Sequence, residues 1–257
     1  MSAGATSAVK SADRVLAILD LLANRGTLTF SEVVDALALP KSSAHNLLAT
    51  MLEREYIELD GERRTYRLGI RVWQIAQSRR DVEDVRLTLK PLMNVLCERT
   101  KETVQLARLE GADAVYLEIN ESPHPMKLSS TVGARLPAHA SGLGKTLLAQ
   151  LDPADARARL GNRELARLTP DTITDVDHLM EELARIRQLG YGTDNEEFAI
   201  GCRCTAMPIR DARGAVVAAL SVSIPTPRWN RDVAARARQL LAQTVGEAET
   251  ALARRAG

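Results

Sequence analysis

Aromatic residues make up only 3% of this chain of 257 residues. Proteins that bind single-stranded nucleic acid usually stack the bases on exposed aromatic rings, so this scarcity argues against such a surface. An excess of charge of one sign is also missing, because 34 lysines and arginines oppose 33 acidic residues and leave a net charge of +1. Any affinity for nucleic acid must therefore come from a local cluster of charge.

Cysteine is sparse as well, and the chain has only Cys97, Cys202 and Cys204. A small and odd number argues against a secreted protein held by disulfides and favours a reducing cytosol. The N-terminal residues lack the apolar core of a signal peptide, and no apolar run reaches the roughly 18 residues of a membrane span. We therefore expect a cytoplasmic protein that has no membrane partner.

The composition is otherwise that of a soluble globular protein, with 45% hydrophobic and 26% charged residues. The length allows two domains, each with a core of its own. We place a first domain at 9–71, a linker helix region at 72–84 and a second domain at 85–255.

The pattern of residues 31–68 predicts a helix-turn-helix followed by a β-hairpin. Pro40 ends the first helix, because proline removes a backbone donor and restrains the residue before it. The second helix, about 41–53, has apolar residues at the clean helical spacing of i, i+3, i+4, i+7 and i+8. Alternating residues at 56–59 and 65–68 predict two strands joined by a basic turn. Such a unit can place one helix in the major groove of double-stranded DNA and a wing beside it.

The polar face of the second helix differs from an ordinary solvated face. It carries short hydroxyl and amide side chains and has no acidic residue before Glu53. Such side chains suit close approach to phosphates and base edges, and the turn of the hairpin adds arginines. The predicted DNA-contacting residues are Lys41, Ser42, Ser43, His45, Asn46, Thr50, Arg63 and Arg64.

The second domain mixes strands and helices. Strands are predicted at 104–110, 114–119, 202–209 and 216–224, and helices at 85–100, 143–151, 153–160, 176–189 and 231–254. Strands follow strands, and the helices are grouped between and after them. This order predicts an α+β domain with an antiparallel sheet flanked by helices.

Three motifs resemble the IclR family of bacterial transcriptional regulators. They are LPKSSAHNLL at 39–48, LPAHASGLGKTLLA at 136–149 and DNEEFAIGCRCTAMPI at 194–209, the last continued by ALSVSIP at 219–225. The resemblance covers nearly the whole chain and implies a winged helix-turn-helix, a GAF-like effector-binding domain and no cofactor. Asn46 departs from the family, which often has arginine there, and this change weakens one expected phosphate or base contact and is expected to alter operator preference.

The resemblance also implies an effector site in the second domain. Its residues combine backbone donors at a helix start with polar and apolar side chains: Gly142, Leu143, Asp194, Cys204, Ser221, Ser223, Met126, Leu128 and Leu136. A helix start favours an anion, so the effector is expected to be a small carboxylate or aromatic acid. The two serines lie two apart on a strand and face the same side; either a ligand or neighbouring protein groups satisfy their hydroxyls.

Other chemistries are disfavoured by local sequence. Gly144-Lys145-Thr146 is no P-loop, because His139 stands where that motif needs glycine. We expect the thiols of Cys202 and Cys204 to lie on opposite faces of their strand, so that they do not share a metal ion. A cysteine hydrolase built from Cys204, His139 and Asp194, with an accessory DNA-binding domain, is one alternative function. A DNA-binding protein that responds to no ligand is another.

A single winged helix offers few contacts for a specific DNA site. We therefore expect two copies of the chain to bind a pseudo-palindromic operator, either as a homodimer or as a dimer of dimers. A bound effector then changes operator affinity only if it prefers one of two assembled states.

Overall fold

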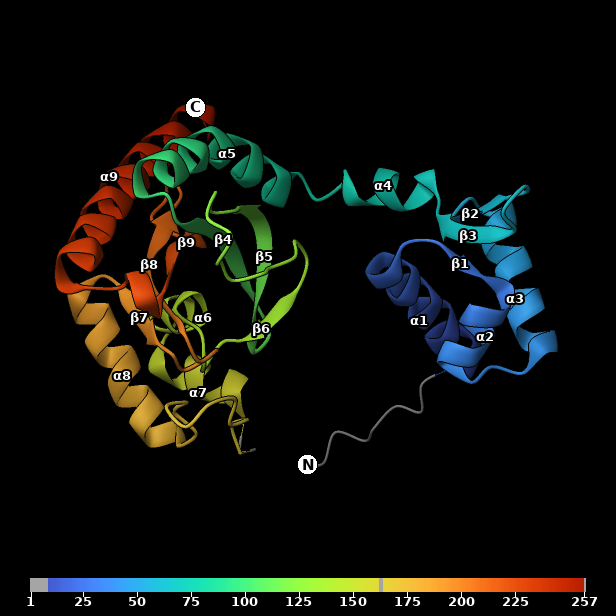
Figure 1. The fold of residues 1–257 in the computed structure, drawn as a ribbon, viewed down its shortest axis with the longest axis horizontal. Helices are drawn as coiled ribbons and strands as arrows, with labels where there is room; N and C mark the ends of the chain where they lie inside the picture. Colours follow the sequence, from blue (N-terminus) through green and yellow to red (C-terminus); the bar gives the residue numbers. More distant parts are fainter. Residues whose placement is uncertain (1–8, 162–163, 257) are drawn as a thin grey trace. The chain divides into compact units, whose positions relative to one another are not determined.

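The computed structural model describes residues 9–161 and 164–256 (Figure 1). The chain divides after Arg80 into two compact units, and this point falls inside the predicted linker at 72–84. Within the described ranges, no helix combines the length and apolar character needed to cross a membrane.

The first unit has the element order of a winged helix-turn-helix. Its elements are α1 (Lys10–Arg25), β1 (Leu28–Thr29), α2 (Phe30–Leu37), α3 (Lys41–Glu53), β2 (Ile57–Asp60), β3 (Thr65–Leu68) and α4 (Ile70–Ala76). The three strands form an antiparallel sheet in the order β1-β3-β2. Apolar residues of α1, α2, α3 and β2 share one core, which includes Ile18, Val33, Leu48 and Ile57.

Local sequence explains how α2 and α3 are separated. Thr29 begins α2 with a capping box: its hydroxyl accepts from the Glu32 N–H at 3.3 Å, and the Glu32 carboxylate accepts from the Thr29 N–H at 2.7 Å. Ala38 ends α2 in the left-handed conformation, with φ of 48°, and Pro40 then occupies the position before α3. The turn between the helices is therefore short and fixed.

The second unit is built on a six-stranded antiparallel sheet in the order β6-β5-β4-β9-β8-β7. Its strands are β4 (Thr103–Glu110), β5 (Asp113–Asn120), β6 (Arg135–Pro137), β7 (Gly192–Asn195), β8 (Cys202–Arg210) and β9 (Val216–Pro225). Its helices are α5 (Arg80–Thr100), α6 (Gly142–Leu148), α7 (Pro153–Leu160), α8 (Val176–Leu189), α9 (Arg231–Ala256) and the 3₁₀ turn η1 (Thr226–Arg228).

Helices cover both faces of this sheet (Figure 1). On one face, α5 and α9 pack on β4, β8 and β9 through a core that includes Leu89, Leu106, Leu220 and Leu241. On the other face lies α6, whose seven residues are all buried against the sheet and α8. The predicted α+β class is confirmed, and the face that carries α6 also carries the candidate site.

The structure differs from the sequence prediction in short elements. Strands β1, β6 and β7 were not predicted, because two to four residues give too little alternation to detect. The predicted helix at 143–151 ends at Leu148, and the helix predicted from 85 begins at Arg80. The longer strands β4, β5, β8 and β9 lie within one or two residues of their predicted ranges.

Candidate functional site

The polar face of α3 is exposed, as its sequence pattern predicts. Of the residues predicted to contact DNA on this helix, Ser43 is half-buried and the others are exposed, whereas Ala44, Leu48 and Met51 are buried in the core of the unit. No side chain caps the start of α3, so its first-turn backbone N–H groups can bind an external anion such as a phosphate. The face can therefore approach a DNA duplex.

The tip of the hairpin presents two arginines that have no ion-pair partner among residues 9–161 and 164–256. Asp60 Oδ1 accepts from the backbone N–H groups of Glu62 and Arg63 at 3.0 and 3.1 Å, which shapes the turn. Arg64 follows in the left-handed conformation, with φ of 52°. Arg63 and Arg64 are exposed, whereas the nearby Arg67 is paired with Glu58 at 2.7 Å. The positive charge of the tip therefore comes from Arg63 and Arg64.

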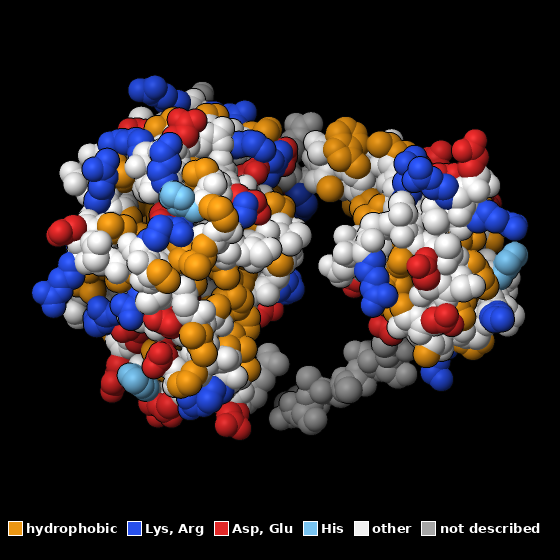
Figure 2. Space-filling view, viewed as in Figure 1, with side chains coloured by type: hydrophobic (Ala, Val, Ile, Leu, Met, Phe, Trp, Pro, Cys, Tyr) orange, Lys and Arg blue, Asp and Glu red, His pale blue; other side chains and the backbone are white. Residues whose placement is uncertain are grey.

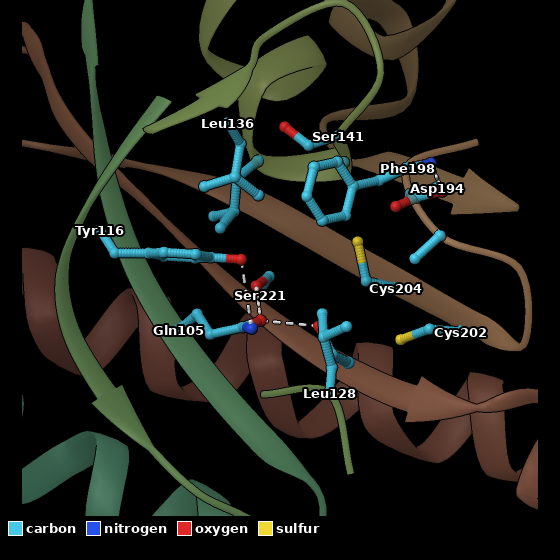
Figure 3. A pocket seen from close by; sticks show the side chains of 14 residues that line it. Gln105, Tyr116, Leu128, Leu136, Ser141, Asp194, Phe198, Cys202, Cys204 and Ser221 are labelled. Atoms are coloured by element: carbon cyan, nitrogen blue, oxygen red, sulfur yellow. Dashed lines mark hydrogen bonds between the residues drawn. The ribbon is translucent and has the colours of Figure 1, made fainter. Parts of the chain in front are cut away.

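A partly enclosed cavity lies in the second unit between the first turn of α6 and the sheet (Figure 3). Only about 20 Å³ of it is open to the centre of a water-sized sphere, which is room for one water molecule. A ligand with a ring therefore requires the walls to move apart. The lining residues are Gln105, Tyr116, Leu128, Leu136, Ser141, Gly142, Leu143, Asp194, Phe198, Ala199, Cys202, Cys204, Ser221 and Ser223.

Eight of the nine residues predicted for the effector site line this cavity. Met126 does not: its side chain is 58% exposed, and its carbonyl oxygen accepts from the Arg228 guanidinium at 3.1 Å. The prediction missed six lining residues: Gln105, Tyr116, Ser141, Phe198, Ala199 and Cys202. Gln105 interrupts an apolar strand, and a polar residue at such a position is a signal of an inward-facing hydrogen bond.

Gln105 satisfies the two serines of β9. Its Oε1 accepts from Ser223 Oγ at 2.6 Å and from Ser221 Oγ at 3.2 Å, while its Nε2 donates to Tyr116 OH at 3.3 Å and Ser130 Oγ at 3.0 Å. Both hydroxyls therefore have a protein partner, which does not prevent a ligand from bonding to them as well. A ligand that enters the cavity meets a connected polar network.

The expectation that Cys202 and Cys204 face opposite ways is wrong. Residues two apart on a strand share a face, and both cysteines line the same cavity (Figure 3). Among the described residues, no third ligating side chain joins them in a group that could hold a metal ion.

The cavity does not have the features of a cysteine hydrolase. Burial raises the pKa of the Cys204 thiol well above its usual range, which is the opposite of an activated nucleophile. His139 lines a different hollow, where its Nε2 lies 2.9 Å from the carbonyl oxygen of Ala166. The arrangement therefore lacks an activated thiol, and the histidine of the proposed triad lies outside the cavity.

Asp194 is a buried ionisable group of this site whose protonation changes near neutral pH. Burial raises the pKa of its carboxyl to about 7, and the nearby Glu197 carboxylate adds to this while Lys145 opposes it. Asp194 Oδ1 accepts from the backbone N–H groups of Glu197 and Phe198 at 2.7 and 3.3 Å. Near neutral pH the carboxyl is partly protonated and can donate to a ligand.

Asp194→Asn is expected to flatten the pH dependence of the unfolding free energy between the ordinary pKa of 3.8 and the raised pKa of about 7. Between these two values the folded protein holds a proton that the unfolded chain releases. The unfolding free energy of the wild-type protein therefore falls as pH rises through this range, and the contribution of Asp194 is constant above about pH 7. The slope removed is at most about 1.4 kcal/mol per pH unit. Urea denaturation at a series of pH values measures it, and identical slopes for both proteins would contradict the raised pKa.

The glycines of α6 are explained by close packing. A Cβ atom on Gly142 would lie 2.5 Å from Cys204 Sγ, and one on Gly144 would lie 2.3 Å from the Cα of Ala138. Ser141 caps the helix by accepting from the Gly144 N–H at 3.1 Å. This packing brings the first turn of α6 against the strands that carry Asp194 and Cys204.

Family models match both units of the chain. The model of the C-terminal domain of bacterial IclR transcriptional regulators matches residues 78–249, and the IclR helix-turn-helix model matches residues 11–61. The HTH-type transcriptional regulator XynR of Escherichia coli K12 is 35% identical over 236 residues, which cover 91% of this chain and 94% of the relative. The transcriptional repressor IclR of the same organism is 33% identical over 234 residues, covering 90% and 85%.

Solved structures agree with these matches. An IclR homolog from Microbacterium hydrocarbonoxydans, complexed with 4-hydroxybenzoate, superposes with a TM-score of 0.83 at 29% identity and covers 96% of this chain and 100% of its own. The IclR of Thermotoga maritima gives a TM-score of 0.76 at 26% identity, covering 95% and 98%. The relatives are regulators and repressors of transcription, which disfavours the hydrolase alternative. The chain belongs to the IclR family of bacterial transcriptional regulators, and it is a DNA-binding regulator with an effector-binding domain.

Proposed function

We propose that this regulator binds its operator through α3 and the hairpin tip, and that a small organic acid in the cavity of the second unit changes operator affinity. The residues assigned to DNA are Lys41, Ser42, Ser43, His45, Asn46, Thr50, Arg63 and Arg64. Residues 9–71 serve as the DNA-binding domain, 72–84 as the linker and 85–255 as the effector-binding domain, in the cytoplasm where the operator DNA is located.

The observation that carries the effector proposal is the partly enclosed cavity with convergent polar groups. Leu128, Leu136 and Phe198 offer apolar walls for a ring, while Ser221, Ser223 and Asp194 offer hydrogen-bonding groups. A neutral Asp194 can donate to a ligand carboxylate, which favours binding of an acid below the pKa of about 7. The 4-hydroxybenzoate in the Microbacterium homolog supports an aromatic acid as the first class to test.

We propose further that two copies bind the operator together, as a homodimer or a dimer of dimers. Hydrophobic side chains gather on α4 in the space-filling view (Figure 2). Ile70, Trp73 and Ile75 are 50%, 61% and 45% exposed, an uncommon concentration on one short helix. Such a patch supports association of α4 with a second chain.

Arg63→Ala and Arg64→Ala are each expected to weaken operator binding severalfold and to reduce its salt dependence. Each free arginine at the tip can neutralise one phosphate, so its loss lowers the slope of log affinity against log salt by about 0.9 for each chain bound. Arg67→Ala is the matched control, because Glu58 already neutralises that guanidinium. Binding measured at four or five salt concentrations tests this, and an equal change for Arg67→Ala would contradict the role of the tip.

The function is tested directly with the DNA upstream of the protein's own gene. Benzoate, 4-hydroxybenzoate and short aliphatic carboxylates are added to the complex, and release from or recruitment to DNA is scored together with the thermal stability of the protein. We expect at least one acid to raise the melting temperature and to change operator affinity. Stabilisation by none of these acids would favour the alternative of a DNA-binding protein that responds to no ligand.

A further inference from the structure

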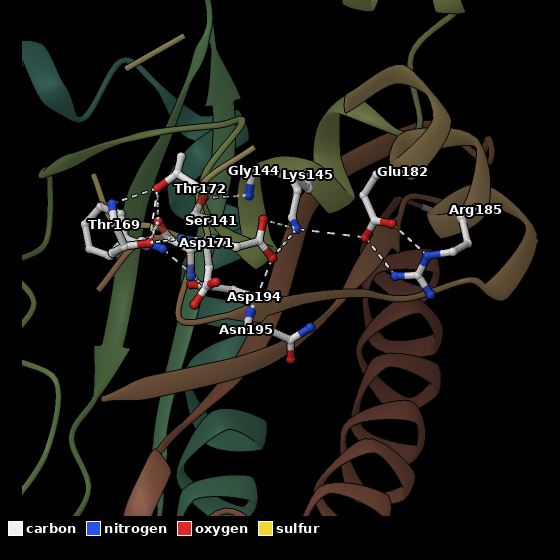
Figure 4. Close-up of polar contacts among 12 residues, drawn as sticks. Ser141, Gly144, Lys145, Thr169, Asp171, Thr172, Glu182, Arg185, Asp194 and Asn195 are labelled. Atoms are coloured by element: carbon white, nitrogen blue, oxygen red, sulfur yellow. Dashed lines mark hydrogen bonds and ion pairs between the residues drawn. The ribbon is translucent and has the colours of Figure 1, made fainter. Parts of the chain in front are cut away.

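A fully buried lysine lies beside the effector cavity. Lys145, in α6, is 1% exposed, and its Nζ lies 2.6 and 2.5 Å from the two carboxylate oxygens of Glu197 (Figure 4). Glu197 is 6% exposed, and the next acidic group, Glu182, is 3.9 Å from Nζ and is held by Arg185. Lys145 follows Gly142 by one helical turn, so the pair joins the cavity's helix to the segment after β7.

Residues 194–199 form a wall that is shared by two spaces. Asp194, Phe198 and Ala199 line the effector cavity, whereas Asn195 and Glu197 line an open hollow together with Lys145. The contacts of Glu197 therefore affect the position of its neighbours Phe198 and Ala199, which line the cavity.

Both backbone polar groups of Glu197, its N–H and its carbonyl oxygen, are hydrogen-bonded to side chains. Its N–H donates to Asp194 Oδ1 at 2.7 Å, and its carbonyl oxygen accepts from Thr172 Oγ1 at 2.7 Å and Thr169 Oγ1 at 3.3 Å (Figure 4). The side chain, held by Lys145, supplies the contact to α6. If the pair is lost, the wall remains tied to the threonines, and its contact with α6 is reduced to the packing of Asp194 against Gly142.

A buried ion pair contributes little net stability, because the desolvation of two charges offsets their attraction. Apolar side chains of similar volume often stabilise a protein as well or better. The short contact of Lys145 with both carboxylate oxygens of Glu197 forms only when the two elements that carry these residues hold one relative position. Here those elements are the two walls of the effector cavity.

We propose that Lys145 and Glu197 are positioning residues of the effector site: their ion pair holds the wall of residues 194–199 against α6, and thereby sets the closed size of the cavity and the ligands that fit it. The inference rests on the proposed function only in taking this cavity as the effector site. Its test needs no effector. A result that contradicts the role of the ion pair can therefore be distinguished from a failure of effector sensing.

The cavity contains its own reporter. Cys204 lines it and is buried, while Cys97 is buried in the separate core between α5 and the sheet. Two proteins are compared, both with Cys202→Ala: one keeps Lys145 and Glu197, and the other carries Lys145→Met and Glu197→Met. The rate of alkylation by iodoacetamide is measured for each remaining cysteine by peptide mass spectrometry. The double substitution removes both charges together and leaves neither buried alone.

We expect Cys204 to be alkylated about tenfold faster in the double variant, with the rate at Cys97 unchanged, because local opening exposes the cavity alone. Loss of the Lys145 charge by itself would slow the reaction, since that charge lowers the pKa of Cys204, so acceleration reports access. Glu197→Gln, which keeps the shape of the side chain, should also raise the alkylation rate of Cys204, by a smaller factor.

Glu118→Gln is the matched control, since Glu118 is also buried and paired, with Arg86 at 2.6 Å, but does not line the cavity. It should leave the Cys204 rate unchanged. Two results would overturn the proposal: equal acceleration at Cys97 and Cys204, which marks a general loss of stability, or no acceleration at Cys204 in either Glu197 variant.

Discussion

Asn46→Asp is expected to lower operator affinity by about 100-fold at physiological salt while the melting temperature stays unchanged. Asn46 is exposed on the polar face of α3, where the sequence up to Glu53 has no acidic residue. The substitution keeps the size of the side chain and replaces an amide donor with a negative charge, which DNA repels. Loss of one base or phosphate contact costs about 1–3 kcal/mol, and repulsion adds to it.

Asn24→Asp supplies the matched control, because it makes the same chemical change at an exposed position of α1 in the same unit. Fluorescence anisotropy with labelled operator DNA measures both variants against the wild-type protein. If Asn46→Asp bound as tightly as wild type, or if Asn24→Asp weakened binding equally, α3 would not be the surface that meets the DNA.

Gly144→Ala is expected to destabilise the effector-binding unit by about 3 kcal/mol, a large fraction of the stability of a typical domain. The added methyl group would lie 2.3 Å from the Cα and 2.4 Å from the carbonyl oxygen of Ala138. Both are backbone atoms, so the clash cannot be relieved by a side-chain rotation. The helix must move away from the sheet, and the cavity at its first turn is then distorted.

Gly246→Ala is the control for this prediction. Gly246 lies in α9, is exposed, and has no atom within 4 Å of an added Cβ. The same substitution there should be neutral or stabilising by about 0.5–1 kcal/mol, because alanine is the better helix former. Urea denaturation of both variants gives the comparison, and a Gly144→Ala protein as stable as wild type would show that α6 is not packed as closely as the structure places it.

The sequence predicted the DNA-binding unit well for a physical reason. Helix α3 was predicted at about 41–53 and is found at Lys41–Glu53, because five apolar residues repeat at helical spacing and Pro40 marks the start. Strand β1 was missed because it has only two residues, which form a strand only through their pairing with β3. Such an element depends on tertiary contacts, which leave no periodic pattern.

The effector cavity was predicted less completely. Its residues came from resemblance to a family, and the groups that organise them, Gln105 and the Lys145–Glu197 pair, were not identified. Lys145 was compared only with a nucleotide-binding motif, and Glu197 was noted only as part of the motif at 194–209. A lysine within a helix of otherwise small and apolar residues is a signal of a buried partner, but the partner 52 residues away cannot be found from spacing alone.

Operator affinity with and without a bound acid is the measurement that tests most directly whether the two units act together. The intact wild-type protein is titrated onto its operator with a carboxylate that raises its melting temperature, supplied at saturating concentration. Occupation of the cavity should shift the operator dissociation constant by about tenfold or more, in the range typical of coupled sites. An acid that saturates the cavity and leaves the dissociation constant unchanged would contradict effector control of DNA binding.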